Sequence, residues 1–334
     1  MTSTLKWLLI GASNIVEQVL PAVLQVPGQQ AVGVYSRSAA RAQEFAQKFQ
    51  IPHYSTDLAG LLSATRPDVA YVSSTNELHH AQTLQALAAG CHVLCEKPLA
   101  MSLAHAQAMV QAARAKGRVL ATNHHLRAHA AHQWIRDAIA QGKVGRVHGV
   151  QVSHAVYLPP HLQGWRLDQP VAGGGVTMDI LVHDVDLLRF LLQRDPLSVQ
   201  CLTQSHGMAS AGLDDSSMSL LEFEDQVLAQ VHVSFVAKYA TSRLHVLGTE
   251  GCIYAEDSLG QSGRATMWLS NAQGRSEVAV EKRNLYVPTV AAFVNAVEGK
   301  GQPLASGEDG LKSMATALTA LDAAREGRKL SVTF

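Results

Sequence analysis

The chain has 334 residues, 47% of them hydrophobic, and its 27 basic residues balance 27 acidic ones. This length suits two domains of about 100–200 residues each, and the apolar content argues against disorder. The charge balance argues against a nucleic-acid-binding protein, which would carry a basic excess or a basic face.

The first third of the chain alternates short apolar runs with amphipathic segments. The opening run, Leu5–Ile10, ends in a glycine and predicts a strand followed by a turn. It is far shorter than the ~20 residues of a membrane span, and no pattern of a signal peptide accompanies it. The alternation predicts a doubly wound parallel sheet, in which ligands bind at the carboxyl ends of the strands. Further strands are predicted at residues 31–35, 53–55, 68–72, 91–94 and 118–122, and helices at 15–24, 38–49, 78–89 and 103–115.

The turn after the first strand indicates a dinucleotide-binding site. It reads GASNIV at residues 11–16, so only the first glycine of a G-x-G-x-x-G/A fingerprint is present. A tight turn that presents backbone N–H groups at a helix N-terminus still favours a pyrophosphate, and a serine hydroxyl can add a donor. A ligand-free turn would look the same, but the position at the first turn of an alternating run favours a cofactor. The assigned residues are Gly11, Ala12, Ser13, Asn14 and Ile15.

The end of the second strand favours NADP(H) over NAD(H). NAD-binding sites usually place a carboxylate here, which bonds the ribose 2′-hydroxyl. This chain instead has Ser36 and Arg37, with Arg41 one turn into the next helix. These side chains could bind a 2′-phosphate through charge-assisted hydrogen bonds. The alternative is an ordinary solvated arginine at the start of a helix.

The segment Glu96-Lys97-Pro98 follows the predicted strand at residues 91–94. Lys97 is therefore expected at the cofactor edge of the sheet, where it could donate to a ribose hydroxyl or a substrate oxygen. The alternative is a surface lysine in a turn.

One predicted helix combines an apolar body with a polar stripe. It follows three glycines at residues 173–175, and its residues Asp179, His183 and Asp186 are spaced to share one face. A histidine exchanges protons near pH 7, and a carboxylate one turn away can orient its ring. The alternative is a buried histidine whose carboxylate partner serves packing alone.

The second half of the chain predicts a different kind of domain. After a helix at about residues 128–141, strands follow one another with few crossovers, which indicates an antiparallel sheet. We therefore expect an α/β protein with a Rossmann-type doubly wound parallel sheet in residues 1–123 and an α+β domain with a large, mostly antiparallel open sheet in residues 124–334. The strands are predicted at residues 147–157, 196–202, 217–223, 226–235, 242–247 and 267–269, with breaks at 224–225 and 248–251 and helices at 288–297 and 311–324.

Taken together, EKPLA at 96–100, GWR at 164–166 and the GGG–D–H pattern at 173–183 resemble the glucose–fructose oxidoreductase / inositol dehydrogenase family. The resemblance implies NAD(P)(H) in the first domain and a polyol or sugar on the sheet of the second. It implies catalytic roles for Lys97, Asp179 and His183, with the histidine as proton donor or acceptor. It also implies a cis peptide bond between Lys97 and Pro98.

Longer strings resemble an NADPH-dependent sugar-ketone reductase of this family: STNELH at 74–79, HVLCEKPLAM at 92–101, TNHHLR at 122–127 and HAVYLPPHLQGWRL at 154–167. This resemblance implies that Ser36 and Arg41 bind the 2′-phosphate, that His154 contacts substrate and that Trp165 and Arg166 adjoin the nicotinamide. Val16 departs from it, because the reductase has alanine there. The remaining cofactor residues implied are Ser74, Thr75, Asn76, His79, Glu96, Lys97 and Asn123, and the substrate residues are Lys97, His154, Asp179 and His183.

Three alternatives remain. The doublets His79-His80 and His124-His125 could suggest a metal site, but adjacent strand residues point to opposite faces and rarely chelate one ion. A non-catalytic NADP-binding regulator would lack Lys97 or His183. The strongest competitor is a dehydrogenase of another sugar or an inositol. We expect no metal, because the four cysteines show no zinc-like spacing. We also expect no nucleic-acid or membrane partner and a cytoplasmic location. The oligomeric state stays open.

Overall fold

The computed structural model describes residues 4–334, and the chain folds as two compact units. The first unit consists of residues 4–124 and Tyr286–Leu311, and the second of His125–Leu285 and Lys312–Phe334. The sequence analysis assigned all of residues 124–334 to the second domain. Residues 286–311 return to the first unit because their helix buries an apolar face there, with the Phe293 ring 5.7 Å from that of Trp7.

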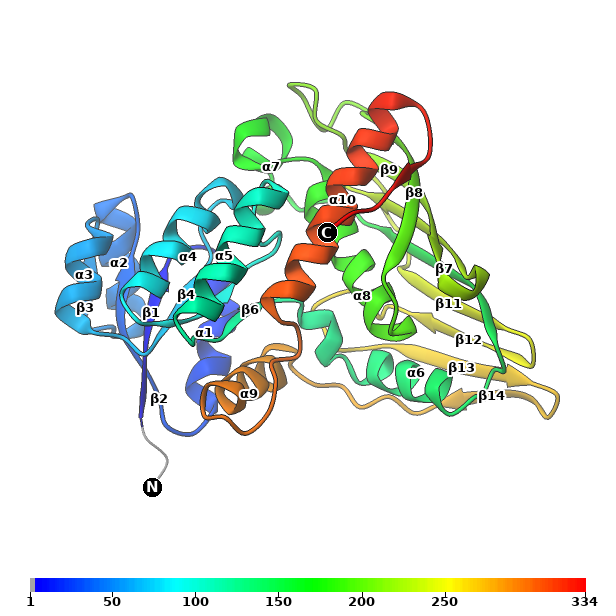
Figure 1. The fold of residues 1–334 in the computed structure, drawn as a ribbon, viewed down its shortest axis with the longest axis horizontal. Helices are drawn as coiled ribbons and strands as arrows, with labels where there is room; N and C mark the ends of the chain where they lie inside the picture. Colours follow the sequence, from blue (N-terminus) through cyan, green and yellow to red (C-terminus); the bar gives the residue numbers. More distant parts are fainter. Residues whose placement is uncertain (1–3) are drawn as a thin grey trace. The chain divides into compact units, whose positions relative to one another are not determined.

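The first unit contains a six-stranded sheet in the order β3-β2-β1-β4-β5-β6, with every neighbouring pair parallel (Figure 1). The strand order reverses between β1 and β4, the place at which doubly wound sheets bind ligands. The predicted Rossmann-type sheet is confirmed. Its strands are β1 (Leu5–Ile10), β2 (Gln29–Tyr35), β3 (His53–Ser55), β4 (Val69–Val72), β5 (His92–Cys95) and β6 (Leu120–Thr122).

The helices of the first unit place an apolar side against this sheet. Trp7, Leu9 and Tyr71 of the strands are fully buried in one cluster with Val19 and Val23 of α1. The sequence analysis missed α3, because its eight residues LAGLLSAT are short and lack a polar face. The helices are α1 (Val16–Gln25), α2 (Ala39–Phe49), α3 (Leu58–Thr65), α4 (His79–Ala88), α5 (Leu103–Ala115) and α9 (Tyr286–Val297).

The second unit contains a nine-stranded sheet in the order β14-β13-β12-β11-β7-β10-β9-β8-β15. All its neighbouring pairs are antiparallel except β7 with β10, so the predicted, mostly antiparallel sheet is confirmed. The sequence analysis missed β12, β14 and β15. The strands are β7 (Val147–Ala155), β8 (Pro196–Gln204), β9 (Ser216–Phe223), β10 (Leu228–Ser234), β11 (Arg243–Gly248), β12 (Gly251–Glu256), β13 (Thr266–Asn271), β14 (Gly274–Val278) and β15 (Leu330–Ser331).

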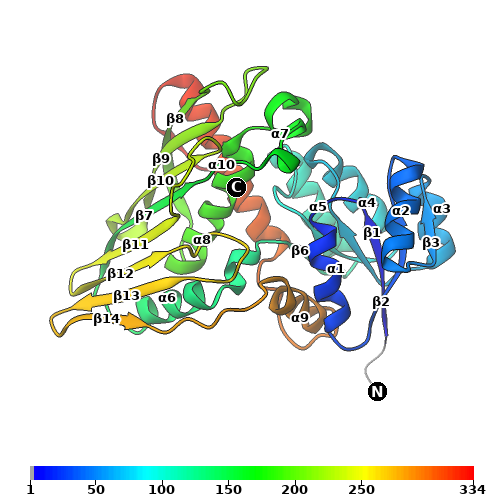
Figure 2. The same cartoon turned by 180° about the vertical axis from the view of Figure 1, so that it is seen from behind.

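Helices α6 (Ala130–Ala140) and α8 (Val182–Leu192) lie against one face of this second sheet, and Figure 2 shows the opposite face. Ten of the eleven residues of α8 are buried, which makes it the central helix of the unit. A five-residue π-helix, Thr177–Leu181, leads directly into α8, and the short α7 (Trp165–Asp168) precedes it. Helix α10 (Gly307–Glu326) follows α9.

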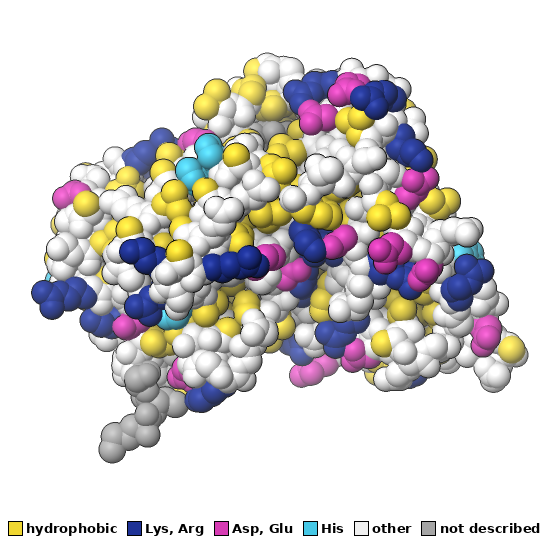
Figure 3. Space-filling view, in the orientation of Figure 1, with side chains coloured by type: hydrophobic (Ala, Val, Ile, Leu, Met, Phe, Trp, Pro, Cys, Tyr) yellow, Lys and Arg dark blue, Asp and Glu magenta, His cyan; other side chains and the backbone are white. Residues whose placement is uncertain are grey.

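The surface is mixed in charge. On the face drawn in Figure 3, basic and acidic side chains alternate with polar and apolar ones. Within residues 4–334, no helix combines the length and the hydropathy needed to cross a membrane.

Candidate active site

The turn after β1 has the geometry that a pyrophosphate-binding turn requires. Gly11 has a φ of 120°, and a Cβ there would lie 2.9 Å from backbone atoms of Ser73 and Ser74, so only glycine fits. No side chain caps the N-terminus of α1, which leaves its first turn for an anionic ligand. The Ser13 hydroxyl donates to that of Ser73 at 3.0 Å. The Val16 side chain is fully buried in the core of the unit, so the departure from alanine is accommodated there.

At the end of β2, Arg41 reaches back over the same turn. Its Nη2 donates to the carbonyl oxygen of Ala12 at 3.0 Å. The Ser36 hydroxyl accepts from the backbone N–H of Ser38 at 3.2 Å, and Ser38 caps the N-terminus of α2. Arg41 therefore contacts the turn after β1, and Ser36 follows the end of the adjacent strand β2.

The loop after β4 is tied to the EKP segment by His79. The His79 Nδ1 lies 2.8 Å from the carbonyl oxygen of Pro98, and its Nε2 lies 3.1 Å from that of Ser74. Burial lowers the pKa of His79, although both carbonyl groups oppose that shift. Both polar atoms of this ring thus face protein atoms. Ser74 and Thr75 donate in turn to Gln82 (2.6 Å) and Glu77 (2.7 Å).

Glu96 lies at the centre of a buried network at the carboxyl ends of three adjacent strands. The Tyr71 hydroxyl of β4 donates to Glu96 Oε1, and Asn123 Nδ2, just after β6, donates to the same oxygen at 2.5 Å. Burial raises the pKa of Glu96, while the Tyr71 and Asn123 hydrogen bonds oppose that rise. The predicted cis peptide bond between Lys97 and Pro98 is confirmed. The network fixes the backbone from which Lys97 projects.

In the second unit, Asp179 lies on the π-helix and His183 in the first turn of α8. The four-residue spacing from Asp179 to His183 therefore spans a junction between a π-helix and an α-helix, whereas the sequence analysis assumed one continuous α-helix. Asp179 Oδ2 accepts from Arg166 Nε at 3.2 Å, and the Arg166 guanidinium stacks 4.6 Å from the Trp165 ring centre. The GWR segment and the π-helix thus meet through Arg166 and Asp179.

The start of the π-helix is anchored by Asp214. Its Oδ2 accepts from the backbone N–H of Thr177 at 3.0 Å and from the Thr177 hydroxyl at 2.5 Å. Gly175, with a φ of 98°, makes the turn that brings the chain to this anchor. A π-helix is rare and frequently marks a functional site.

His154 on β7 is held by a carboxylate of α8. Its Nδ1 lies 2.8 Å from Oδ1 of Asp184, and both residues are buried. The ring of His125 lies edge-on to that of His183, with 5.1 Å between centres. The imidazole rings of His125 and His154 therefore both contact residues in the first turn of α8.

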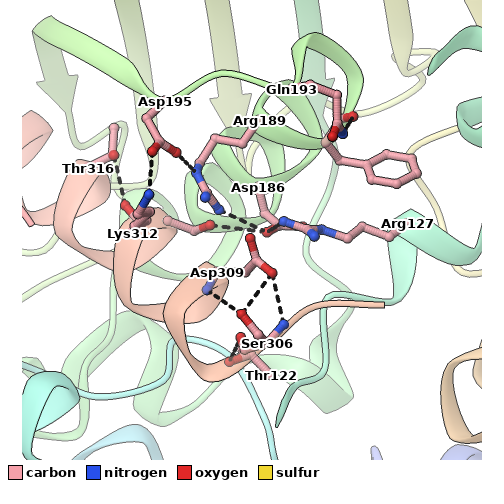
Figure 4. A network of polar contacts seen from close by, with 12 residues as sticks. Thr122, Arg127, Asp186, Arg189, Gln193, Asp195, Ser306, Asp309, Lys312 and Thr316 are labelled. Atoms are coloured by element: carbon pink, nitrogen blue, oxygen red, sulfur yellow. Dashed lines mark hydrogen bonds and ion pairs between the residues drawn. The ribbon is translucent and has the colours of Figure 1, made fainter. Parts of the chain in front are cut away.

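Asp186, which the spacing placed beside Asp179 and His183, instead forms a bidentate pair with Arg127. Arg127 Nε and Nη2 donate to its two carboxylate oxygens at 2.8 and 2.7 Å (Figure 4). Both side chains are at least nine-tenths buried. The figure also shows Arg189, which donates to Asp195 at 2.7 Å. These ion pairs link α8 to Arg127, which precedes α6, and to Asp195, which follows α8.

Sequence reasoning missed Tyr71 and Asp184. Tyr71 lies within the apolar run DVAYV, where nothing distinguishes it from a core residue. Asp184 adjoins His183, but helical spacing selects residues three or four apart and so passed over it. An acidic residue inside a buried helix was the available signal, because such a group needs a partner.

Within residues 4–334, no three His, Cys, Asp or Glu side chains are grouped so that they could hold a metal ion. The first unit contains the turn after β1, the Arg41 guanidinium in contact with that turn, and the EKP segment that follows β5. The second brings together Asp179, His183 and the His154–Asp184 pair. These are the groups needed to bind a dinucleotide and to exchange a proton with an oxygen-bearing substrate.

Known proteins share this organisation. Residues 5–124 match the family described as "Oxidoreductase family, NAD-binding Rossmann fold", and residues 132–254 match the GFO/IDH/MocA C-terminal domain. The chain is 46% identical to 1,5-anhydro-D-fructose reductase from Ensifer adhaerens over 98% of each chain. It is 26% identical to D-glucoside 3-dehydrogenase from Escherichia coli over 92% of each chain. A crystal structure of aldose-aldose oxidoreductase from Caulobacter crescentus, complexed with glycerol, matches with a TM-score of 0.90 and 22% identity over 98% of this chain and 100% of that chain, a likeness of fold.

Proposed function

This chain belongs to the GFO/IDH/MocA family of oxidoreductases, and from that premise we propose that it is an NADPH-dependent reductase of the C2 ketone of 1,5-anhydro-D-fructose. The observation that carries the proposal is the 46% identity to a reductase of that sugar over nearly the full length of both chains. The product is a 1,5-anhydrohexitol, by resemblance the mannitol epimer.

The first unit supports NADP(H) as the cofactor. Its phosphate turn excludes any residue but glycine at position 11, and the end of β2 offers Ser36, Arg37 and Arg41 rather than a carboxylate. A guanidinium binds a phosphate by charge-assisted hydrogen bonds, whereas a carboxylate would repel it. Further cofactor contacts are assigned to Asn14, Asn76 and the Trp165-Arg166 pair.

When bound, the reduced nicotinamide supplies a hydride to the carbonyl carbon. Lys97 donates a hydrogen bond to the carbonyl oxygen and stabilises the negative charge that develops there. His183 donates a proton to that oxygen, which completes a secondary alcohol. Asp179 orients His183, and Arg166 holds Asp179 in turn.

In this proposal His154 contacts a hydroxyl of the sugar through its ring nitrogen Nε2. Its Nδ1 is engaged by Asp184, so Nε2 is the atom that is left for substrate. All four cysteines are free thiols, which fits a reducing compartment, and a cytoplasmic location is part of the proposal.

A second candidate is an NAD(P)-dependent dehydrogenase of another sugar or an inositol. It is favoured by relatives at lower identity that bear the names of a glucoside and a myo-inositol dehydrogenase. The two candidates share Lys97, Asp179 and His183 and differ only in substrate.

Initial rates decide between them. NADPH and NADH oxidation are measured with 1,5-anhydro-D-fructose, with a panel of ketoses and with an inosose. We expect fast NADPH oxidation with the anhydro sugar alone. Activity with another panel member in its place rejects the substrate and retains the site, and a preference for NADH rejects the assignment of Ser36 and Arg41.

A further inference from the structure

We propose that Asp184 is a positioning residue of the substrate site: its buried carboxylate fixes the tautomer of His154, so that Nε2 accepts a hydrogen bond from a sugar hydroxyl. This inference rests on the proposed function, in which His154 contacts substrate. Asp184 itself touches neither substrate nor cofactor.

The geometry of the pair carries the argument. Asp184 Oδ1 lies 2.8 Å from His154 Nδ1, across from α8 to the neighbouring strand β7. The Asp184 side chain is fully buried, and 9% of the His154 side chain is exposed. The Asp184 side chain is therefore out of reach of a substrate, and the small exposed part of His154 is what a substrate can contact.

The Asp184 carboxylate makes no second polar contact in the described part of the chain. Among residues 4–334, Asp184 Oδ2 makes no hydrogen bond, so the bond to His154 is the side chain's single polar contact. Burying a carboxylate with one partner is costly, and well-packed apolar residues often replace such pairs without loss of stability. A group this costly indicates a role other than stability.

A further histidine, His132 on α6, interacts electrostatically with His154 and is neutral near pH 7. Burial lowers the pKa of His132 on α6 to about 3, and His129, His154 and His125 contribute to the electrostatic surroundings. His132 Nδ1 lies 2.9 Å from the carbonyl oxygen of Leu126, so this nitrogen carries the proton of the neutral ring. His132 is therefore not a cation that could pair with Asp184 in place of His154.

The consequence for His154 follows from imidazole chemistry. In a neutral ring, the hydrogen bond at one nitrogen decides which nitrogen is protonated. Donation from Nδ1 to Asp184 leaves the Nε2 lone pair as an acceptor. A site built to bond a hydroxyl rejects analogues that lack it, so Asp184 contributes to the choice of a polyhydroxylated substrate.

The first test is spectroscopic and needs neither substrate nor cofactor. Enzyme labelled with ¹⁵N-histidine is compared with Asp184→Leu, which keeps the shape of the side chain and removes its hydrogen-bond acceptor, and His154→Gln identifies the His154 signals by their loss. We expect a protonated Nδ1 and an unprotonated Nε2 in the wild type at neutral pH, and a shift of that proton in Asp184→Leu. A His154 signal that is the same in both proteins overturns the proposal, and so does protonation of Nε2 in the wild type.

The second test is kinetic, on whichever panel ketone the wild type reduces. We expect Asp184→Leu to raise the KM for that ketone about tenfold, the loss of roughly one substrate hydrogen bond, with the KM for NADPH unchanged. Asp184→Glu should recover part of that loss. Asp137→Asn is the control, because it removes an exposed carboxylate of α6 that pairs with its neighbour Arg136, and it should keep wild-type constants.

Failure of this inference and failure of the proposed function have different signatures. If Asp184→Leu lowers only the melting temperature and leaves the ketone KM unchanged, the residue is structural and the inference is overturned. If the wild type reduces no panel member, the proposed function fails, and the ¹⁵N spectra still decide the tautomer. Should Asp184→Leu fold poorly, Asp184→Ala removes the same hydrogen-bond acceptor and provides the same comparison.

Discussion

Arg41 does two jobs with one guanidinium. Its Nη2 bonds the carbonyl oxygen of Ala12, which holds the side chain over the phosphate turn before any ligand arrives. A guanidinium that is already oriented loses less conformational entropy when it binds a phosphate. The same economy recurs at Asp179, which Arg166 holds, and at His154, which Asp184 holds. Each of these three proposed site residues is thus held by a group from another segment of the chain.

Arg41→Ala tests the cofactor assignment. We expect the Kd for NADPH to rise about 10- to 100-fold, since a hydrogen bond to a charged group contributes about 1.5–3 kcal/mol, and the Kd for NADH to change little. Fluorescence titration of both cofactors measures this. Lys48→Ala, which removes an exposed cation of the same helix, is the control and should leave both constants alone. An equal loss for NADPH and NADH would contradict a 2′-phosphate contact.

His183→Asn tests the proton donor. We expect kcat to fall about 10²–10⁴-fold, the usual contribution of general acid–base catalysis, while the Kd for NADPH stays unchanged. Steady-state rates and cofactor titration measure the two effects separately. His148→Asn, at an exposed histidine of β7, is the matched control. Turnover that survives in His183→Asn would remove this residue from the mechanism.

At the scale of elements, the junction between the π-helix and α8 organises the second unit. Asp214 bonds Thr177 at its start, and the Arg127–Asp186 pair braces α8 beyond it. Asp179 and His183, the proposed catalytic residues, lie between these two fixed points. Three carboxylates therefore hold this region in three ways: half-buried Asp214 anchors the π-helix, buried Asp186 braces α8, and buried Asp184 pairs with a histidine.

Asp186→Asn tests the brace. The variant leaves the Arg127 guanidinium buried without its counter-ion, and breaking a buried pair in this way costs about 3–5 kcal/mol. Glu308→Gln is the comparison, because it breaks an exposed pair with Arg114 and should cost at most about 1 kcal/mol. Thermal unfolding of both variants measures the difference. Equal melting temperatures would show that the Arg127–Asp186 pair does not stabilise the fold.

The same elements show what the sequence could predict. The strands of the first unit were found because both faces of a parallel sheet are covered, which gives continuous apolar runs such as Leu5–Ile10. β14 was missed because its residues, GRSEV, are polar and mostly exposed. Strand β12 was missed because it starts at Gly251, where the glycines indicated only a turn.

The candidate site was predicted as far as linear patterns reach. Lys97 and His183 were selected from short motifs, and the family resemblance added His154 and Arg166. Tyr71 and Asp184 could not be selected, since their partners Glu96 and His154 lie 25 and 30 residues away in the sequence. Their roles depend on tertiary contacts, which spacing along one element does not encode.

At the scale of the whole molecule, several of the 16 histidines are buried in neutral form. Burial lowers the pKa of His79, of His129 and, to about 3, of His132. Their folded pKa values lie below the unfolded value of about 6.5, so on acidification the unfolded chain takes up protons that the folded chain does not. The stability that they contribute is complete above pH ~6.5 and is lost as the pH falls below that value.

His132→Asn tests this sign. Between pH 7 and pH 5 the variant should lose about 2 kcal/mol less stability than the wild type, because one proton-linked group is removed. Asparagine can still donate to the Leu126 carbonyl that His132 faces. Unfolding by urea at both pH values measures the difference, with His148→Asn as the control. If His132→Asn loses as much stability between pH 7 and pH 5 as the wild type does, proton uptake by His132 in the unfolded chain does not cause that loss.

The return of Tyr286–Leu311 to the first unit has a consequence for protein synthesis. Ribosomes extend a chain by about 5–20 residues per second, so roughly ten to thirty seconds separate the last strand of the first sheet from helix α9. During that interval Phe293, which packs against the Trp7 ring in the folded protein, has not yet been synthesised. The nascent first unit therefore carries an uncovered apolar face while the second unit is being made, and this face is a natural binding site for a ribosome-associated chaperone.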